Sequence, residues 1–355
     1  MASRVTDAVD PRERLGRVLE EWQEPGAAEL GELLHGMLGD ALGPERPLDV
    51  ERLKAEVYRL RIGAAPGQTL VLKRLTPAIA HTDRLVAERW LPALGLGDCC
   101  PQLLGAAAQR EGCWVWHVYE DLGHDTLAER RWPWRLAAAV DLLAELHTRA
   151  AAYPLLPEVR WRARDLGAHF FTANLHDAIR ALDALATLRR EVPREFPAAR
   201  ARLLERLHGL LEEAPRRVQL LNEVGGPDTL LHGDLWPKNV FVATAGERPR
   251  ARLIDWDHVG AGPFSYDLST FLYRSAAEER LWILARYRAA VERAGWHLPG
   301  HDELNLLFHT AESARYAHCI LFDAMAVLND GAEWGIGELI DYARWLEALR
   351  PPLPD

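Results

Sequence analysis

The sequence predicts an α+β protein in two parts, a small antiparallel sheet followed by a larger, mainly helical part. Residues 57–62, 68–75 and 113–119 alternate between apolar and polar side chains or form apolar runs, which is typical of β-strands. Residues 134–151 carry apolar side chains at helical spacing. The same helical spacing of apolar side chains recurs in four later stretches: 176–188, 198–211, 278–293 and much of the chain after residue 302. With 355 residues, 48% of them hydrophobic, the chain is long enough to bury two cores.

The first two strands are joined by Ala65-Pro66-Gly67, whose proline and glycine favour a turn. The second strand carries Lys73 among apolar neighbours. Because an unpaired ammonium group is expensive to bury, Lys73 is either an exposed edge charge or has an anionic partner. The segment after Pro77 is predicted to be helical, and we expect Glu88 within it to reach Lys73.

The third strand runs into Glu120-Asp121-Leu122-Gly123. A strand that ends in a glycine-containing connector suits a hinge between the two predicted parts. An ordinary strand and loop predict the same sequence, so both interpretations stay open. Before the sheet, residues 1–45 indicate two helices around Glu24-Pro25-Gly26 that pack against it.

The most informative segment is His232-Gly233-Asp234-Leu235-Trp236-Pro237-Lys238-Asn239, and Asp255 follows sixteen residues after Asn239. An aspartate, an asparagine five residues on and a second aspartate closing an apolar strand form the arrangement that phosphoryl transfer needs. One carboxylate orients the acceptor hydroxyl, while an amide oxygen and another carboxylate hold Mg²⁺ against the nucleotide phosphates. Either half alone is a common turn or strand end, but both in this order indicate a kinase.

A hairpin is predicted to bring the two halves of this motif together. Val240–Val242 and Leu253-Ile254 are short β-prone runs, and Gly246–Pro249 between them supplies turn residues. Such a hairpin brings Asn239, just before its first strand, beside Asp255, just after its second.

These residues resemble the aminoglycoside phosphotransferase and choline kinase family of small-molecule kinases. The resemblance covers residues from about 50 to 345, and it is carried by Leu231–Leu235, Asn239, Ile254–Asp257, Gly260 and Tyr266–Leu268. It implies the two-lobed, protein-kinase-like fold and transfer of the γ-phosphoryl group of ATP to a hydroxyl of a small molecule, with Mg²⁺. It also implies an N-lobe ending in the hinge (46–122) and a helical C-lobe (123–355), and residues 1–45 are predicted to precede them as an N-terminal helical extension that the resemblance does not cover.

The resemblance implies a role for each matching residue. Asp234 would be the catalytic base, and Asn239 and Asp255 the Mg²⁺ ligands. Lys73 would orient the α- and β-phosphates and pair with Glu88. The remaining implied roles are structural support from His232 and Asp267 and main-chain contacts to adenine from Glu120 and Leu122.

Two alternatives compete with this hypothesis. A protein acceptor is disfavoured because only eleven residues separate Asp255 from Asp267, too few for an activation segment and its phosphosite. A nucleotide-binding regulator without catalysis would be expected to lack one of the key side chains, and none is missing. The chain also has no G-x-G-x-x-G before Lys73, so the contacts of its phosphate-covering loop stay unassigned.

Lys238 could place an ammonium group near the transferring phosphoryl, or could be an ordinary loop lysine. Asp257 would share the face of Asp255 in an extended chain, where it could support the metal or contact the substrate. The candidate acceptor contacts, chosen by position alone, are Trp236, Glu312, Tyr316 and Trp334. Because Asp257, Glu312 and Glu333 could attract an ammonium group, we expect a cationic acceptor, first of all an amine-bearing alcohol.

The composition of the chain limits the classes of binding partner and the cellular locations that are expected. The net charge of −10 argues against nucleic acid, because binding of its phosphates needs a basic surface. The sequence contains no run of eighteen uncharged apolar residues and no apolar core near Met1, so neither a membrane span nor a signal peptide is indicated and a cytoplasmic protein is expected. The four cysteines form no zinc spacing and no disulfide framework, which favours reduced thiols.

Overall fold

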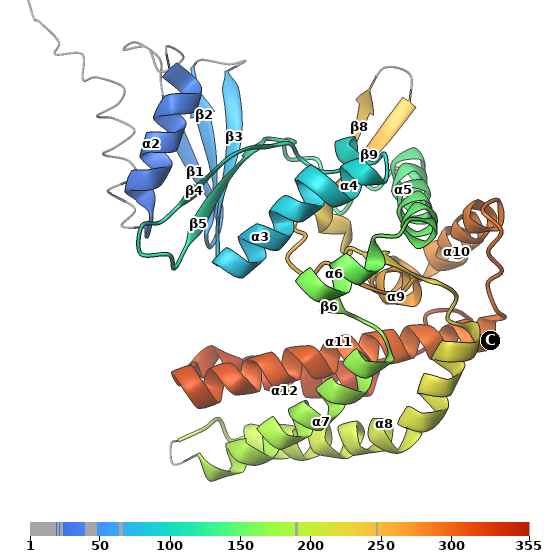
Figure 1. The fold of residues 1–355 in the computed structure, drawn as a ribbon. Coiled ribbons are helices and arrows are strands. Elements are labelled where there is room, and N and C mark those ends of the chain that lie inside the picture. Colours follow the sequence, from blue (N-terminus) through green and yellow to red (C-terminus); the bar gives the residue numbers. More distant parts are fainter. Residues whose placement is uncertain are drawn as a thin grey trace, which may run out of the picture. The chain divides into compact units, whose positions relative to one another are not determined.

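The computed structural model describes Leu19, Glu21 and residues 24–39, 48–63, 67–188, 191–245 and 248–354. The chain divides into two compact units, shown with the rest of the fold in Figure 1. The small unit comprises Met1–Asp125 and Arg252–Asp257, and the large unit comprises Thr126–Ala251 and His258–Asp355. Of the expected extension 1–45, the structure describes Leu19, Glu21 and residues 24–39; the rest lies outside the described residues.

The small unit is built on a five-stranded sheet with the order β1-β2-β3-β5-β4, in which every neighbouring pair is antiparallel. Its strands are β1 (Leu48–Lys54), β2 (Val57–Ile62), β3 (Gln68–Leu75), β4 (Leu103–Ala108) and β5 (Val115–Glu120). The predicted strands therefore exist, and β3 lies at the centre of the sheet. Lys73 of β3 stands opposite Val57 of β2 and His117 of β5.

Helix α2 (Ala27–Leu38) covers one face of this sheet because its apolar residues recur every four positions. Leu30, Leu34 and Leu38 are buried in a cluster that includes Trp116 of β5. The start of the helix is fixed to the same tryptophan, whose indole N–H donates to the carbonyl of Pro25 at 2.9 Å.

Helix α3 (Pro77–Leu85) follows β3 and continues through a π-helical turn, η2 (Val86–Trp90), into α4 (Leu91–Ala93). A short turn, η3 (Gly97–Cys99), then leads to β4. The buried residues of this stretch include Ala80, Asp83, Val86 and Trp90, so its inward face carries one carboxylate among apolar side chains.

The large unit is mainly helical, with two small sheets. Its helices are α5 (Pro133–Ala152), α6 (Leu156–Arg162), α7 (Ala168–Ala184) with the turn η4 (Leu185–Thr187), α8 (Phe196–Val224), α9 (Ser265–Tyr273), α10 (Ala277–Glu292), α11 (His301–Asp330) and α12 (Glu333–Ala348). One sheet has the order β6-β10-β7, from β6 (Arg164–Asp165), β10 (Gly260–Pro263) and β7 (Asp228–Leu231). The other is the predicted hairpin, β8 (Val240–Ala245) with β9 (Arg248–Leu253).

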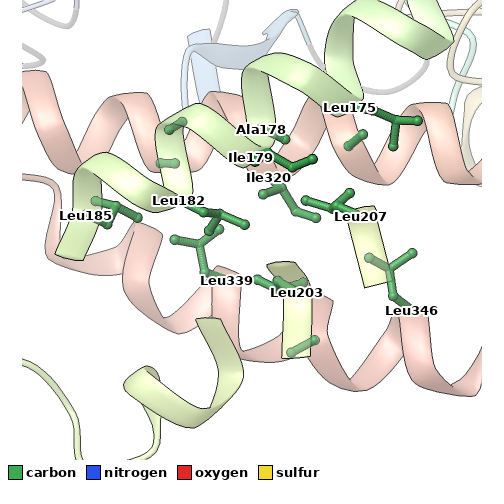
Figure 2. Packing of buried hydrophobic residues seen from close by; sticks show 14 of the residues in the cluster. Leu175, Ala178, Ile179, Leu182, Leu185, Leu203, Leu207, Ile320, Leu339 and Leu346 are labelled. Atoms are coloured by element: carbon green, nitrogen blue, oxygen red, sulfur yellow. The ribbon is translucent and has the colours of Figure 1, made fainter. Parts of the chain in front are cut away.

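The main core of the large unit lies where α7, α8, α11 and α12 meet. Figure 2 shows side chains of the buried cluster there, including Leu182 of α7, Leu203 of α8, Ile320 of α11 and Leu339 of α12, all fully or almost fully buried. These residues come from stretches in which the sequence shows helical periodicity. Within the described part of the chain, none of the helices has both the length and the apolar character needed to cross a membrane.

Candidate active site

The loop between β7 and β8 contains the residues from His232 to Asn239 and is shaped by Gly233. This glycine has a φ of 82°, and a Cβ atom in its place would lie 1.8 Å from the carbonyl oxygen of His258. Only glycine fits here, because any side chain would meet the backbone and strain the left-handed conformation. The turn sets the direction in which the chain enters Asp234.

Asp267 of α9 binds the backbone of the same turn. Its fully buried carboxylate accepts hydrogen bonds from the backbone N–H groups of His232 at 2.7 Å and Gly233 at 2.9 Å. Burial alone would raise the pKa of this carboxyl, but the nearby imidazoles of His147 and His232 and the backbone donors hold the pKa below its usual range. His147 is itself buried against the hydroxyl of Tyr287, at 2.8 Å. An ionised carboxylate thus anchors the loop.

Asn239 closes the loop onto Asp234. Its side-chain N–H donates to the backbone carbonyl of Asp234 at 2.9 Å, and its amide nitrogen lies 3.5 Å from the Asp234 carboxylate. Because this bond uses the amide nitrogen, the amide oxygen of Asn239 is left as a possible ligand for a hard cation. His232 supports the turn as well, since its Nδ1 accepts from the N–H of Asp234 at 3.3 Å.

In the small unit, Lys73 joins two carboxylates that follow β9. Its ammonium lies 2.6 Å from an oxygen of Asp255 and 2.6 Å from an oxygen of Asp257. The second oxygen of Asp255 accepts from Lys54 at 2.9 Å. Asp255 has a φ of 69°, an uncommon backbone conformation for a non-glycine residue and one that is found at functional sites.

These contacts decide the ionisation of the cluster. Burial would raise the pKa of Asp255, but the charges of Lys73 and Lys54 lower it well below its usual range. For Asp257, burial and the neighbouring Asp255 raise the pKa, against the opposing effect of Lys73. Burial would lower the pKa of Lys73, but the carboxylates of Asp255, Asp257 and Asp83 raise it. Lys73 is therefore a charged lysine within the sheet that has anionic partners, and it is not an exposed edge charge.

The expected pair between Lys73 and Glu88 is not formed. Glu88 points outward and binds Arg84 at 2.7 Å, and both side chains are about half exposed. The acid on the inward face of the helix is Asp83, five residues earlier, which lies 3.1 Å from Nδ1 of His117 and accepts a short hydrogen bond from the hydroxyl of Tyr119. The helical spacing of Ala80, Asp83 and Trp90 was the signal that could have identified it.

The connector after β5 is held by side chains of the small unit. Glu120 binds Arg252 and accepts from the backbone N–H of Gln102 at 2.7 Å, and although burial would raise its pKa, the bond from Arg252 lowers it. Asp121 accepts from Arg59 at 2.7 Å. The side chain of Glu120 is thus committed to structure, and any contact of Glu120 or Leu122 to adenine would come from the main chain.

Comparison of the sequence with known protein families identifies the family of this chain. The sequence pattern of the phosphotransferase enzyme family matches residues 45–307, more than half of the chain. The chain belongs to this family. No curated protein sequence matches it.

Solved structures of other phosphotransferases share the fold. The Plasmodium vivax ethanolamine kinase is 12% identical, with a TM-score of 0.57 and an alignment that covers 97% of this chain and 95% of that chain. The complex of APH(2")-IIia with GDP and kanamycin is 16% identical, with a TM-score of 0.55 and coverage of 89% and 99%. Spectinomycin phosphotransferase, in complex with ADP and spectinomycin, is 12% identical, with a TM-score of 0.53 and coverage of 87% and 90%. At these identities the likeness concerns the fold, and the predicted two-lobed, kinase-like α+β architecture is confirmed.

Glu312 of this phosphotransferase does not have the surroundings expected of an acceptor contact. Its carboxylate is fully buried and accepts from Arg274 at 2.7 and 2.5 Å and from Arg315 at 3.2 Å. Two guanidinium groups therefore neutralise it, and the expectation that Glu312 attracts an ammonium group is corrected. Asp257 is likewise paired, with Lys73.

The other acceptor candidates, Trp236, Tyr316 and Trp334, belong to the large unit and have different surroundings. The indole of Trp236 has the ammonium of Lys238 4.6 Å from its centre and the guanidinium of Arg274 at 4.5 Å, so Lys238 is held by a cation–π contact. Tyr316 packs against Tyr342 and Trp345 of α12, with ring centres 6.1 and 6.5 Å apart. Trp334 is 57% exposed at the start of α12. The sequence reasoning missed Arg274 and Arg315, for which no local pattern gives a signal.

Proposed function

We propose that the chain is an ATP-dependent small-molecule kinase that transfers the γ-phosphoryl group to a hydroxyl of its acceptor. The observation that carries this proposal is the salt bridge of Lys73 with Asp255 and Asp257, which gathers one cation and two carboxylates from distant parts of the sequence. The three side chains are partly buried, and ion pairs removed from water contribute little net stability once desolvation is counted, so stability alone does not account for the cluster. Handling of nucleotide phosphates and their cation would account for it.

The residues present fit Mg²⁺. Asp255 is held ionised by Lys73 and Lys54, and each of its oxygens keeps a second lone pair for a cation; Asn239 has its amide nitrogen committed to the carbonyl of Asp234, which leaves its amide oxygen. Mg²⁺ prefers such hard oxygen ligands and takes the remainder from water and phosphate. When bound with ATP, Mg²⁺ would supply charge neutralisation at the β- and γ-phosphates. We propose Asn239 and Asp255 as the residues that hold it.

The other residues prepare the acceptor and the nucleotide. Lys73 would bind the α- and β-phosphates, whose oxygens replace the carboxylates as partners of its ammonium group. Asp83, rather than Glu88, would be the helix acid whose negative charge favours the charged form of Lys73. Asp234 would accept the hydrogen bond, and then the proton, of the acceptor hydroxyl. Lys238, held against Trp236, would add positive charge near the transferred group. The main-chain groups of Glu120 and Leu122 would hold the adenine.

For the acceptor we propose a small hydroxylated molecule, with an amine-bearing alcohol as the first choice. The support is that structures with this fold include an ethanolamine kinase and complexes with kanamycin and spectinomycin. The charge argument for a cation is weaker than the sequence suggested, because Glu312 and Asp257 are both paired. Tyr316 and Trp334 remain as aromatic candidates, with Trp236. An ATP-dependent kinase needs a compartment that contains ATP, so we propose that the protein is located in the cytoplasm.

The test is nucleotide turnover against a panel of acceptors. The purified protein is incubated with Mg²⁺, with ATP or GTP in turn, and with amino alcohols, amino sugars, aminoglycosides and neutral polyols, and product nucleotide and phosphorylated acceptor are measured. Asp234→Asn serves as the matched control. Acceptor-dependent turnover by the natural protein, but not by Asp234→Asn, supports the proposal. Tight nucleotide binding without transfer to any hydroxyl would favour the regulator instead.

A further inference from the structure

Arg315 of α11 reaches the proposed catalytic loop of the large unit. One nitrogen of its guanidinium donates to the carbonyl of Gly233 at 2.8 Å and lies 3.3 Å from Oδ1 of Asp234. Another donates to the hydroxyl of Thr270 in a short bond, and its Nε donates to Glu312 at 3.2 Å. A single side chain thus holds both the peptide before Asp234 and the carboxylate of Asp234.

Charge balance ties Asp234 to this arginine. Arg274, Glu312 and Arg315 form a network in which the one carboxylate is fully buried and the two guanidinium groups are 15% and 10% exposed. Without a further anion, this Arg274–Glu312–Arg315 network carries one excess positive charge in a poorly solvated place. The carboxylate of Asp234 supplies the balancing negative charge.

The guanidinium is also fixed in orientation. The ring of Tyr266 lies 4.6 Å from its central carbon, and Tyr266 and Thr270 both belong to α9, which is almost entirely buried. The donors of Arg315 are therefore aimed by two packed helices, α9 and α11. Sites supported by rigid elements hold reacting groups more accurately than sites supported by loops.

We propose that Arg315 is a positioning residue, which fixes the rotamer of Asp234 by binding Oδ1 and so leaves Oδ2 for the acceptor hydroxyl. The inference rests on the proposed function of Asp234 as the base. A lysine in this place would keep the charge but could not replace the planar fork that joins Gly233, Thr270 and Glu312 at once. Geometry and charge can therefore be separated by substitution.

The first arm of the experiment is kinetic. Arg315→Lys and Arg315→Met are compared with Arg217→Lys, a buried arginine of α8 that pairs with Glu213 at 2.6 Å and contacts Thr310 of α11. Both Arg315 variants should lower kcat about 100-fold, the effect of a misplaced catalytic group, while the KM for ATP stays constant. Arg217→Lys should reduce thermal stability and leave kcat unchanged. Equal losses of kcat in Arg315→Lys and Arg217→Lys would overturn the proposal.

The second arm does not depend on knowing the acceptor. Crystal structures of the natural protein and of Arg315→Lys are compared for the side-chain torsions of Asp234. A changed rotamer or a disordered carboxylate in the variant supports the proposal, and an unchanged carboxylate overturns it, whatever the activity. Glu312→Gln, which weakens the anchor of Arg315, should move Asp234 in the same way and serves if Arg315→Lys fails to fold. If Asp234→Asn retained full transfer, the proposed function would fail, while the structures would still decide whether Arg315 positions this side chain.

Discussion

Lys73 and Asp255 stand 182 residues apart in the sequence and form a salt bridge of 2.6 Å in the small unit. Asp255 lies in the short segment Arg252–Asp257, which belongs to the small unit although the chain on both sides of it belongs to the large one. Lys54 completes the contact on the other carboxylate oxygen, at 2.9 Å. Two cations thus keep this carboxylate ionised and oriented, which is the condition that a ligand of Mg²⁺ requires.

The substitution Asp255→Asn tests this carboxylate. It removes a negative ligand, so we expect the affinity for Mg-ATP to fall at least about 10-fold, as for other disrupted metal sites, together with the rate. Calorimetric titration with Mg-ATP measures the affinity. Asp257→Asn is the matched control, since it also takes a partner from Lys73 but is not a proposed ligand. An affinity that falls for Asp257→Asn and holds for Asp255→Asn would reverse the assignment.

The substitution Asp234→Asn tests the base. The asparagine side chain has nearly the same shape but cannot accept a proton, so kcat should fall by about 10²–10⁴-fold. Nucleotide affinity should hold, because the proposed role of Asp234 concerns the acceptor. Single-turnover transfer and equilibrium ATP binding are measured on the same preparation. Residual turnover within a few-fold of the natural protein would exclude Asp234 as the base.

The sequence was sufficient where local chemistry determines the structure. The hairpin formed by β8 and β9 follows from two β-prone runs with a turn between them, and the strand that carries Lys73 follows from its apolar pattern. The turn at Gly233 is equally local, since only glycine fits there. For these elements, neighbours in the sequence supply most of the constraints.

Partners distant in the sequence could not be predicted in this way. Glu312 reads as an accessible acid, yet Arg274, 38 residues earlier, neutralises it. Glu88 lies in the segment predicted to be helical, but Trp90 and Asp83 are on its buried face, and Glu88 is on the exposed face. Such choices depend on tertiary packing, which overrides local preference.

The two acids of this helix make a matched pair for a third test. Asp83→Asn removes a buried charge that contacts His117 and Tyr119 and lies near Lys73, so we expect a loss of about 1–3 kcal/mol in the free energy of unfolding and a higher KM for ATP. Glu88→Gln breaks only a surface pair with Arg84 and should change both quantities little. Denaturant unfolding and steady-state kinetics measure them. A raised KM in Glu88→Gln alone would restore the original expectation.

The last prediction concerns Asp323 of α11, a 4% exposed residue whose Oδ2 has no hydrogen-bond partner among the described residues. Burial raises the pKa of Asp323 from 3.8 to about 6, against a hydrogen bond from Tyr342 that lowers it, and Glu338 raises it further. The folded protein therefore binds this proton more tightly than the unfolded chain, so stability falls as pH rises from 3.8 to about 6. Asp323→Asn keeps the shape without the charge and should raise the unfolding free energy above pH 6, a gain that fades as pH approaches 4. Denaturant unfolding across this range measures it, and Asp177→Asn is the control, because Asp177 of α7 is half-exposed and pairs with Arg180 on the surface of the helix. A gain that grows on acidification would show that the charge of Asp323 is stabilising and that its pKa is not raised.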